Sequence, residues 1–184
     1  MKFERQAIPD VILVTPKRFG DARGFFSETF RANVYAAEGI SGPFVQDNQA
    51  YSADAGVLRG LHFQVPPRAQ AKLVRCTRGA ILDVAVDLRK SSPTFGQHIS
   101  AELTAENGAQ LFVPAGFAHG YLTLSPDCVV VYKMTDYYAP ESERGLAWDD
   151  PDLGIAWPLP NDAPVLSEKD TVLPGLANFD SPFE

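Results

Sequence analysis

The sequence lacks the long apolar runs and the positive charge that mark membrane proteins and nucleic-acid-binding proteins. No stretch approaches the ~20 apolar residues that span a bilayer, and the opening MKFERQAIPD has no signal-peptide core. Only 16 Lys and Arg residues stand against 23 Asp and Glu, which gives a net charge of -7. Since nucleic-acid affinity rests on clustered cations, we expect no nucleic acid and no membrane as partner, and we expect a cytoplasmic protein.

Cysteine is also scarce. Cys76 and Cys128 are the only two, and both lie inside apolar runs. Two isolated cysteines form neither a disulfide framework nor a four-ligand zinc pattern, so we expect buried, reduced thiols.

What the sequence does contain is a series of short β-type runs in a chain of one-domain size. The 184 residues are 45% hydrophobic, which suits one packed domain over residues 1–184. Gly, Pro, Asn and Asp separate the runs. The expected strands are Val11–Thr15, Val57–Phe63, Lys72–Cys76, Ile81–Leu88, His98–Leu103, Leu111–Val113, Tyr121–Leu124 and Val129–Met134. Many short strands at close spacing indicate an all-β sandwich or barrel.

Two segments lie outside this pattern. Thr29–Glu38 is expected to be a helix, because Phe30 and Val34 recur at helical spacing and Gly39 is placed to end it. Residues 139–184 are rich in Pro, Asp and Trp and lack periodicity, so we expect them to wrap the barrel.

The most specific local signal ends at His119. Gly108 is followed after five residues by Pro114-Ala-Gly116-Phe-Ala-His119, which resembles the second motif of the cupin superfamily. Pro and Gly there are expected to build a turn that aims the histidine into the barrel. The resemblance implies a cupin-type jelly-roll barrel with a few short peripheral helices.

The first cupin motif is present in altered form, and the change bears on metal binding. Metal-binding cupins use His, His, Glu and His, whereas the corresponding residues here are His62, Gln64, Lys72 and His119. An ammonium has no lone pair with which to bind a cation. We therefore expect no metal and no cofactor. A positive charge beside two imidazoles suits an oxyanion or a phosphate instead.

Strand alternation groups polar side chains on apolar faces, because every second residue of a strand shares a face. The groups are Lys72, Val74 and Cys76; Val130, Tyr132 and Met134; His62 and Gln64; and Gln46 and Asn48. We interpret them as the lining of one pocket. Arg59 is the exception, because strict alternation turns it away from His62 unless a bulge at Gly60 brings it back.

A closer resemblance covers almost the whole chain in order. Its segments are Asp21–Glu28, Gln46–Asn48, Gly56–Gln64, Ala69–Lys72, Asp83–Arg89, Ser92–Gly96, Pro114–Gly120, Tyr132–Lys133 and Leu166–Asp170. They are similar to the dTDP-4-dehydrorhamnose 3,5-epimerases. The resemblance implies cofactor-independent epimerisation of a dTDP-keto-sugar, dTDP-4-dehydro-6-deoxy-D-glucose, at C3 and C5 in dTDP-L-rhamnose biosynthesis, and it implies a homodimer.

The chemistry suits these residues. Both carbons flank the C4 ketone, so a base can remove either proton if the enolate oxygen is stabilised. His62, with an ordinary pKa of ~6.5, is the expected base, Lys72 the partner of the enolate, and Tyr132 the acid on the opposite face. The resemblance assigns the carboxylate that holds the base to Asp170, and Asp83 is a rival.

The resemblance also implies a set of substrate-binding residues. They are Arg23, Glu28, Gln46, Asn48, Arg59, Lys72, His119, Glu143 and Lys169, with Tyr138 stacking on the thymine.

Three other functions stay open. The chain could invert only C3 or only C5, could bind a sugar nucleotide without using the tyrosine, or could be a metal-dependent cupin. For the homodimer, we expect the strand Val11–Thr15 to add to a partner's sheet.

Overall fold

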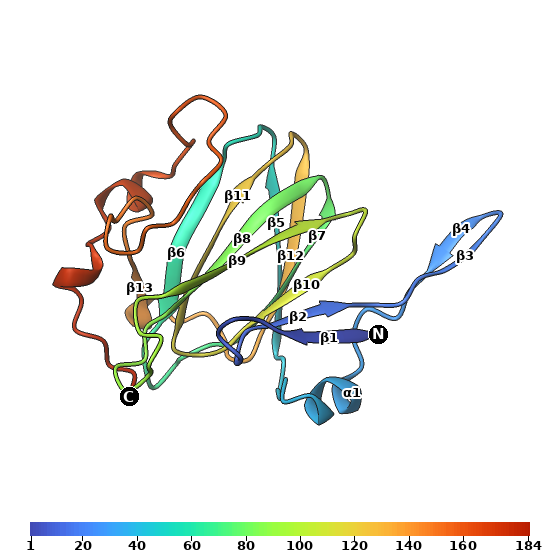
Figure 1. Cartoon of the computed structure of the whole chain (residues 1–184), viewed down its shortest axis with the longest axis horizontal. Coiled ribbons are helices and arrows are strands. Elements are labelled where there is room, and N and C mark those ends of the chain that lie inside the picture. Colours follow the sequence, from blue (N-terminus) through green and yellow to red (C-terminus); the bar gives the residue numbers. More distant parts are fainter.

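The computed structural model describes residues 1–184 and is built almost entirely of short strands (Figure 1). The strands are β1 (Lys2–Arg5), β2 (Ile12–Thr15), β3 (Phe19–Asp21), β4 (Gly24–Phe26), β5 (Gln46–Ser52), β6 (Leu58–Gln64), β7 (Lys72–Arg78), β8 (Ala80–Asp87), β9 (His98–Thr104), β10 (Gln110–Val113), β11 (Phe117–Thr123), β12 (Cys128–Met134) and β13 (Glu143–Gly145). The helices are α1 (Ala32–Ala37) and the 3-10 turns η1 (Pro140–Ser142), η2 (Glu168–Val172) and η3 (Leu176–Asn178).

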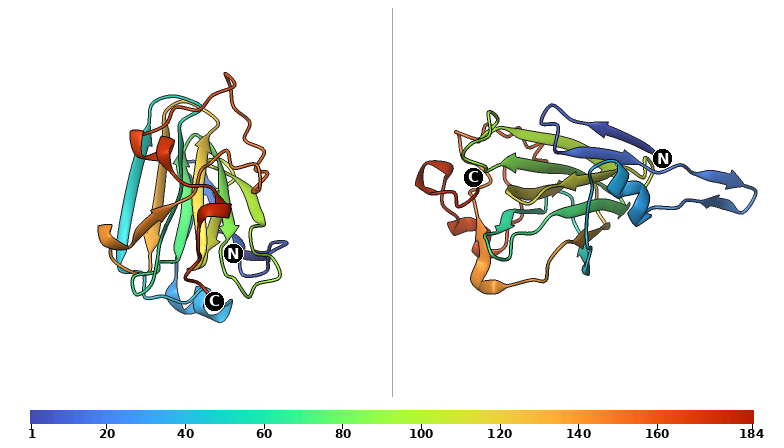
Figure 2. Two further views of the ribbon diagram at one scale, coloured as in Figure 1. Left: turned by 90° about the vertical axis from the view of Figure 1, so that its left-hand side faces the viewer. Right: turned by 90° about the horizontal axis from the view of Figure 1, so that it is seen from below.

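The strands form two antiparallel sheets that face each other. One sheet has the order β1-β2-β10-β7-β12-β5, and the other has the order β13-β6-β11-β8-β9. The hairpin β3–β4 is a separate ribbon that projects from the barrel (Figures 1 and 2). The predicted all-β jelly roll with few short helices is therefore confirmed, and every predicted strand is present.

Burial on both sides explains why the central strands are so apolar. The largest cluster lies between the sheets and includes Ile81 and Ala85 of β8. The alternate residues Val84 and Val86 belong to a second cluster on the outer face, which the C-terminal segment covers with Phe183 and other side chains. A strand covered on both faces has no polar face, so β8 reads as one apolar run.

A third cluster lies on the outer face of the other sheet, where α1 packs through Tyr35. The helix is shorter than the predicted Thr29–Glu38. Arg31 is extended, and the Thr29 carbonyl accepts hydrogen bonds from the Tyr35 hydroxyl (2.7 Å) and from Gln110 Nε2 (2.8 Å). These tertiary bonds use a carbonyl that a longer helix would need, so the segment that leads into α1 stays extended.

The expectation that Val11–Thr15 adds to a partner's sheet is wrong. β2 pairs with β1 along one edge and with β10 along the other, so its backbone groups are already bonded within the chain. The free edges of this sheet belong to β1 and β5.

The segment after β13 runs along the outer side of the sheet that contains β6, away from the hairpin β3–β4 (Figures 1 and 2). Val165 forms a parallel bridge with Val57, and the Phe183 carbonyl accepts a bond from the Lys90 amide. This course brings η2 against β6, where it matters for the site. No helix has the length and apolar character required to cross a membrane.

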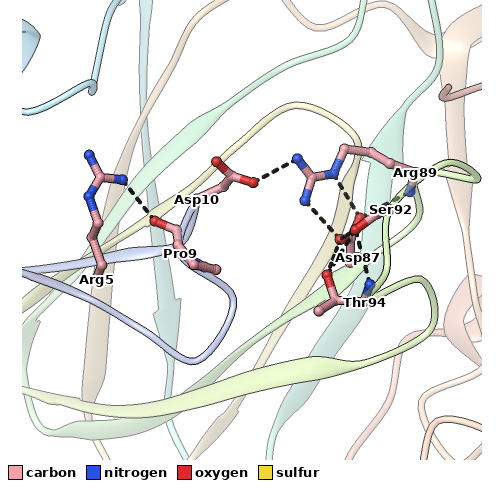
Figure 3. Close-up of polar contacts among 7 residues, drawn as sticks. All are labelled: Arg5, Pro9, Asp10, Asp87, Arg89, Ser92 and Thr94. Atoms are coloured by element: carbon pink, nitrogen blue, oxygen red, sulfur yellow. Dashed lines mark hydrogen bonds and ion pairs between the residues drawn. The ribbon is translucent and has the colours of Figure 1, made fainter.

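A buried polar cluster ties the N-terminal loop to the end of β8 (Figure 3). Asp87 is fully buried and accepts bonds from Arg89, Ser92 and Thr94, and Arg89 also reaches Asp10 at 2.8 Å. Burial raises the pKa of Asp87, but these donors outweigh it and lower the pKa to about 2. Hydrogen bonds to Asp87 therefore hold the loop in which the chain turns from β8 toward β9.

Candidate functional site

A cavity of about 500 Å³ opens between the two sheets. The interior faces of β5, β6, β7, β11 and β12 line it, and β13 and η2 form part of its rim. Every residue predicted for the site lines this cavity except Arg23 and Glu28. The polar residues that strand alternation placed in one pocket line this cavity, whereas Val74, Cys76 and Val130 belong to the apolar cluster between the sheets.

His62 and Asp170 form a tight pair at the side of the cavity. His62 Nε2 lies 2.6 Å from Asp170 Oδ1, and the Asp170 side chain is 2% exposed. Burial lowers the pKa of His62, while Asp170 opposes this effect. The imidazole is therefore neutral near pH 7, and with Nε2 facing the carboxylate, Nδ1 is the nitrogen left to accept a proton.

Lys72 is a buried cation in the same cavity. Its Nζ donates to the His62 carbonyl at 3.1 Å, and the residue is 9% exposed. Burial lowers the pKa of Lys72 to about 8, although Asp83 and Glu143 oppose it. The ammonium is thus mostly protonated at neutral pH, but its charge is not as fixed as the sequence analysis assumed.

Tyr132 lies on the opposing sheet, on β12, and its neighbour on β5 in the strand register is Asn48. Burial raises the pKa of Tyr132, while Arg59 and Asn48 oppose the shift, so the hydroxyl keeps its proton. Gln46 Nε2 donates to Asn48 Oδ1 at 3.0 Å, which orders the two amides along β5. A neutral imidazole and a protonated phenol therefore come from different sheets and face one cavity.

His119 forms a second histidine-carboxylate pair. It is the direct register partner of His62 on the neighbouring strand, and its Nε2 lies 2.8 Å from Asp83 Oδ1. Asp83 therefore bonds to His119 and not to His62, whose carboxylate partner is Asp170.

The rim of the cavity carries a hydrogen-bonded chain of side chains. Glu143 accepts from Lys169 Nζ at 2.8 Å and from the Tyr138 hydroxyl at 3.0 Å. The Tyr138 amide in turn donates to Gln46 Oε1 at 2.9 Å. Tyr138 is 54% exposed, so its ring is accessible at the mouth.

A bulge explains how Arg59 reaches the cavity. The register of β6 against β11 shifts between His119 and Tyr121, where two residues of β6 oppose one of β11. Gly60 lies at this point with φ +137, and a Cβ there would meet the Gly120 Cα at 2.6 Å. The predicted bulge at Gly60 is therefore present, and Arg59 lines the cavity with His62.

The donor set does not suit a metal ion. Gln64 uses its amide to bind backbone groups, donating to the Arg68 carbonyl and accepting from the Ala139 amide. His62 and His119 each face a carboxylate, and Lys72 is an ammonium. No three side chains of His, Cys, Asp or Glu are grouped to hold a metal.

Arg23 and Glu28 lie away from the cavity. Arg23 is on the projecting hairpin, its side chain is 89% exposed, and it pairs with Asp21 at 2.6 Å. Glu28 follows the hairpin and lies 3.3 Å from Arg31. Within one chain, neither residue can reach a ligand in the barrel.

Several lining residues were not predicted. They are Ala50, Phe63, Gln70, Tyr121 and Ser167. Tyr121 stood in a predicted strand two residues after His119, so alternation would have placed it on the same face. Gln70 gave no signal, because it lies in a loop and donates to the Asp136 carbonyl.

The chain is similar to known sugar-nucleotide epimerases over nearly its whole length. The sequence model of dTDP-4-dehydrorhamnose 3,5-epimerase matches residues 5–178. A dTDP-4-dehydrorhamnose 3,5-epimerase of Sinorhizobium fredii is 53% identical over 184 residues, covering all of this chain and 94% of that protein.

Solved structures agree with these sequence matches. A dTDP-4-dehydrorhamnose 3,5-epimerase from Bacillus anthracis with TDP and PPi bound has a TM-score of 0.92 and 48% identity, over 95% of this chain and 99% of that one. A dTDP-6-deoxy-D-glucose-3,5-epimerase from Legionella pneumophila in complex with dTDP-4-keto-L-rhamnose has a TM-score of 0.92 and 45% identity, over 97% and 94%.

Proposed function

The chain belongs to the dTDP-4-dehydrorhamnose 3,5-epimerase family, and we propose that it inverts C3 and C5 of dTDP-4-dehydro-6-deoxy-D-glucose to give dTDP-4-dehydro-L-rhamnose. It is thus an isomerase. One observation carries the assignment of roles: a carboxylate-bound imidazole, a buried ammonium and a protonated phenol line the same cavity.

In the first step, His62 Nδ1 takes the proton from the carbon beside the C4 ketone. The electrons of the broken C–H bond form a C=C bond and move the carbonyl π electrons onto the C4 oxygen. Asp170 holds the Nε2 hydrogen, so the imidazole is fixed in the required tautomer and its cation is stabilised once the proton arrives.

In the second step, Lys72 stabilises the enolate. Its ammonium has one donor on the His62 carbonyl, which leaves two for the substrate oxygen. A preorganised cation in a buried site strongly stabilises the negative charge that develops on the substrate oxygen, because little solvent screens it.

In the third step, Tyr132 returns a proton to the opposite face of the carbon. Its raised pKa keeps the hydroxyl protonated until the enolate forms. The enolate electrons re-form the ketone as the new C–H bond closes. His62 and Tyr132 then exchange protons with water, and the same cycle serves the second carbon.

The nucleotide is held at the rim. Arg59 and Lys169 supply positive charge for the diphosphate, and Arg59 can engage two oxygens with its planar fork. The exposed Tyr138 ring offers a stacking surface for the thymine.

Arg23 and Glu28 complete the site if two copies of the chain assemble. The hairpin exposes three aromatic side chains, Phe19, Phe25 and Phe26, at 54%, 61% and 70%. Such an apolar ribbon projecting from the barrel fits a surface of a second copy (Figure 1). In the proposed homodimer, the hairpin of one chain carries Arg23 toward the cavity of the other.

Turnover in D₂O tests the function. The purified protein is incubated with dTDP-4-dehydro-6-deoxy-D-glucose and a downstream reductase, and the product is analysed by NMR. Deuterium at both C3 and C5, with inversion at both, supports the double epimerase. Label and inversion at a single carbon would assign a single-position epimerase, and absence of turnover would leave a binding protein.

His62→Ala is the control for that experiment, because contaminating epimerase would persist in it. Activity that disappears with EDTA and returns with added metal would overturn the cofactor-independent mechanism.

A further inference from the structure

A polar group that the proposed reaction does not use lies next to the cavity: His119 and Tyr121 line the cavity, and the buried Asp83 bonds to His119. Asp83 of β8 and Tyr121 of β11 are direct register partners on the inner face of the sheet. Asp83 is 0% exposed and bonds through Oδ1 to His119, which is 6% exposed. Burial of a carboxylate costs free energy unless hydrogen bonds or a counter-ion compensate for it, so Asp83 is expected to have such partners.

The bonding of Asp83 is incomplete. Asp83 Oδ2 and the Tyr121 hydroxyl are both buried, and neither has a hydrogen-bond partner. The other cavity carboxylates are already engaged: Asp170 with His62, and Glu143 with Lys169 and Tyr138. Asp83 therefore retains a free anionic oxygen in the interior.

Lys72 is a buried cation on whose charge Asp83 acts. Lys72 has one hydrogen bond, to a backbone carbonyl, and has no bonded carboxylate of its own. Four groups act on its charge: burial and Lys169 of η2 disfavour the ammonium, whereas Asp83 of β8 and Glu143 of β13 favour it. Asp83 is the stronger of the two favourable groups. The remaining titratable or charged groups that line the cavity are Arg59, His62, His119, Tyr121, Tyr132, Tyr138 and Asp170.

We propose that Asp83 is a positioning residue of this enzyme. It is the buried counter-ion that keeps Lys72 charged, and its Oδ1 fixes His119. It acts through these two side chains and does not touch the substrate. The inference rests on the proposed function, in which Lys72 holds the enolate.

The test compares two matched variants, Asp83→Asn and Asp170→Asn. Each removes the charge from one of two adjacent histidine-carboxylate pairs and keeps an oxygen to accept the imidazole hydrogen. A kcat/KM profile against pH then separates the two carboxylates, because the acid limb reports the neutral His62 and the alkaline limb reports the protonated Lys72.

In wild type the alkaline limb is expected near pH 8. Asp83→Asn moves this limb to lower pH by about one unit or more and lowers kcat/KM about fivefold or more at pH 8, with a smaller loss at pH 6. Asp170→Asn leaves the alkaline limb in place and moves the acid limb to lower pH. A loss in Asp83→Asn that is the same at every pH, with the limb unmoved, would indicate a merely structural role and overturn the inference.

A second measurement does not depend on activity. NMR titration of ¹³C,¹⁵N-lysine-labelled protein, assigned with Lys72→Arg, gives the pKa of Lys72 directly. It is expected near 8 in wild type and in Asp170→Asn, and at least about one unit lower in Asp83→Asn. An unchanged Lys72 pKa in a folded Asp83→Asn protein rejects the inference, whatever the epimerase activity of that variant. Lack of epimerase activity in the wild type would reject the proposed function and leave this titration valid.

Discussion

The surroundings of each cavity side chain set its protonation state and so its part in the proposed reaction. Burial and Asp170 pull the pKa of His62 in opposite directions, and the result is a neutral imidazole. Burial raises the pKa of Tyr132, which keeps the phenol protonated. Two groups in one cavity are thereby held in opposite proton states at the same pH, which is the requirement for removal of a proton on one face and delivery on the other.

Tyr132→Phe should separate proton removal from inversion. Without the acid, His62 can still remove the proton and return it to the same face, so substrate in D₂O should acquire deuterium with retained configuration. Product formation should fall on the order of 10²- to 10⁴-fold. Proton NMR of the recovered substrate, with a coupled assay for product, measures both rates.

His62→Ala serves as the comparison, because it should abolish exchange as well as product. If Tyr132→Phe keeps wild-type turnover, Tyr132 is not the acid, and the chain would be a cupin that does not use its tyrosine.

At the scale of the strands, a bulge and closely packed glycines decide where these side chains point. The bulge in β6 lets Arg59 and His62 line one cavity although they are three positions apart. Glycine at positions 60 and 120 permits the close approach of the two backbones. At the other end of the sheet, Asp87 bonds to Arg89 and the loop before β9.

Gly60→Ala should unfold more easily than the wild type. The added Cβ would lie 2.6 Å from the Gly120 Cα, and the residue has φ +137, so both packing and backbone oppose the change. We expect a loss of about 3 kcal/mol in the free energy of unfolding, measured in urea. Gly154→Ala is the control, because φ there is +58 and no atom lies within 4 Å of the new Cβ. Equal losses in the two variants would show that crowding at the bulge is unimportant.

Asp87→Asn should lower stability in a pH-dependent manner. The folded pKa of about 2 is below the unfolded value of ~3.9, so the stabilisation is complete above about pH 4 and is lost as pH falls toward 2. The difference between wild type and variant should be about 2 kcal/mol at pH 7 and should shrink at pH 3, as measured by urea unfolding.

Asp10→Asn is the matched control, since it removes the exposed end of the same cluster (Figure 3). It should cost less than about 1 kcal/mol. A constant difference between wild type and Asp87→Asn from pH 7 to pH 3 would contradict the assigned ionisation.

At the scale of the whole molecule, one chain contains the proposed base, acid and enolate partner but places Arg23 outside the barrel. The hairpin that carries Arg23 extends away from the sheets and exposes three phenylalanines (Figures 1 and 2). The C-terminal segment, in contrast, packs back on its own sheet and delivers Asp170 and Lys169 to the rim. One end of the fold is therefore covered by its own chain, and the other carries the apolar ribbon through which we propose that a second copy binds.

The double variant Phe25→Ser, Phe26→Ser should be monomeric. Size-exclusion chromatography with light scattering should give twice the 20.1 kDa chain mass for wild type and the chain mass for the variant. The kcat/KM should also fall, about tenfold, because the partner's Arg23 no longer reaches the diphosphate. Phe95→Ser, an exposed phenylalanine elsewhere, should remain dimeric. A wild type that is monomeric at micromolar concentration would reject the proposed assembly.

Much of the fold could be predicted from the sequence, because strands buried on one or both faces leave a direct record in apolar runs and turn residues. Strands without that record were missed. β5 is a polar edge strand, and β1, β3, β4 and β13 are three or four residues long. The predicted helix was too long, because one of the two bonds to the Thr29 carbonyl comes from Gln110, in a distant part of the chain.

The sequence by itself determined the family, the jelly roll and most of the side chains of the cavity, because family resemblance, motif spacing and strand alternation can all be recognised along the chain. Tertiary structure decided which carboxylate serves which histidine: Asp170 lies 108 positions after His62 and 2.6 Å from it, and Asp83 bonds to His119. It also decided that Arg23 lies outside the barrel. These pairings arise where separate strands and the C-terminal segment meet, and no spacing along one strand records such a contact.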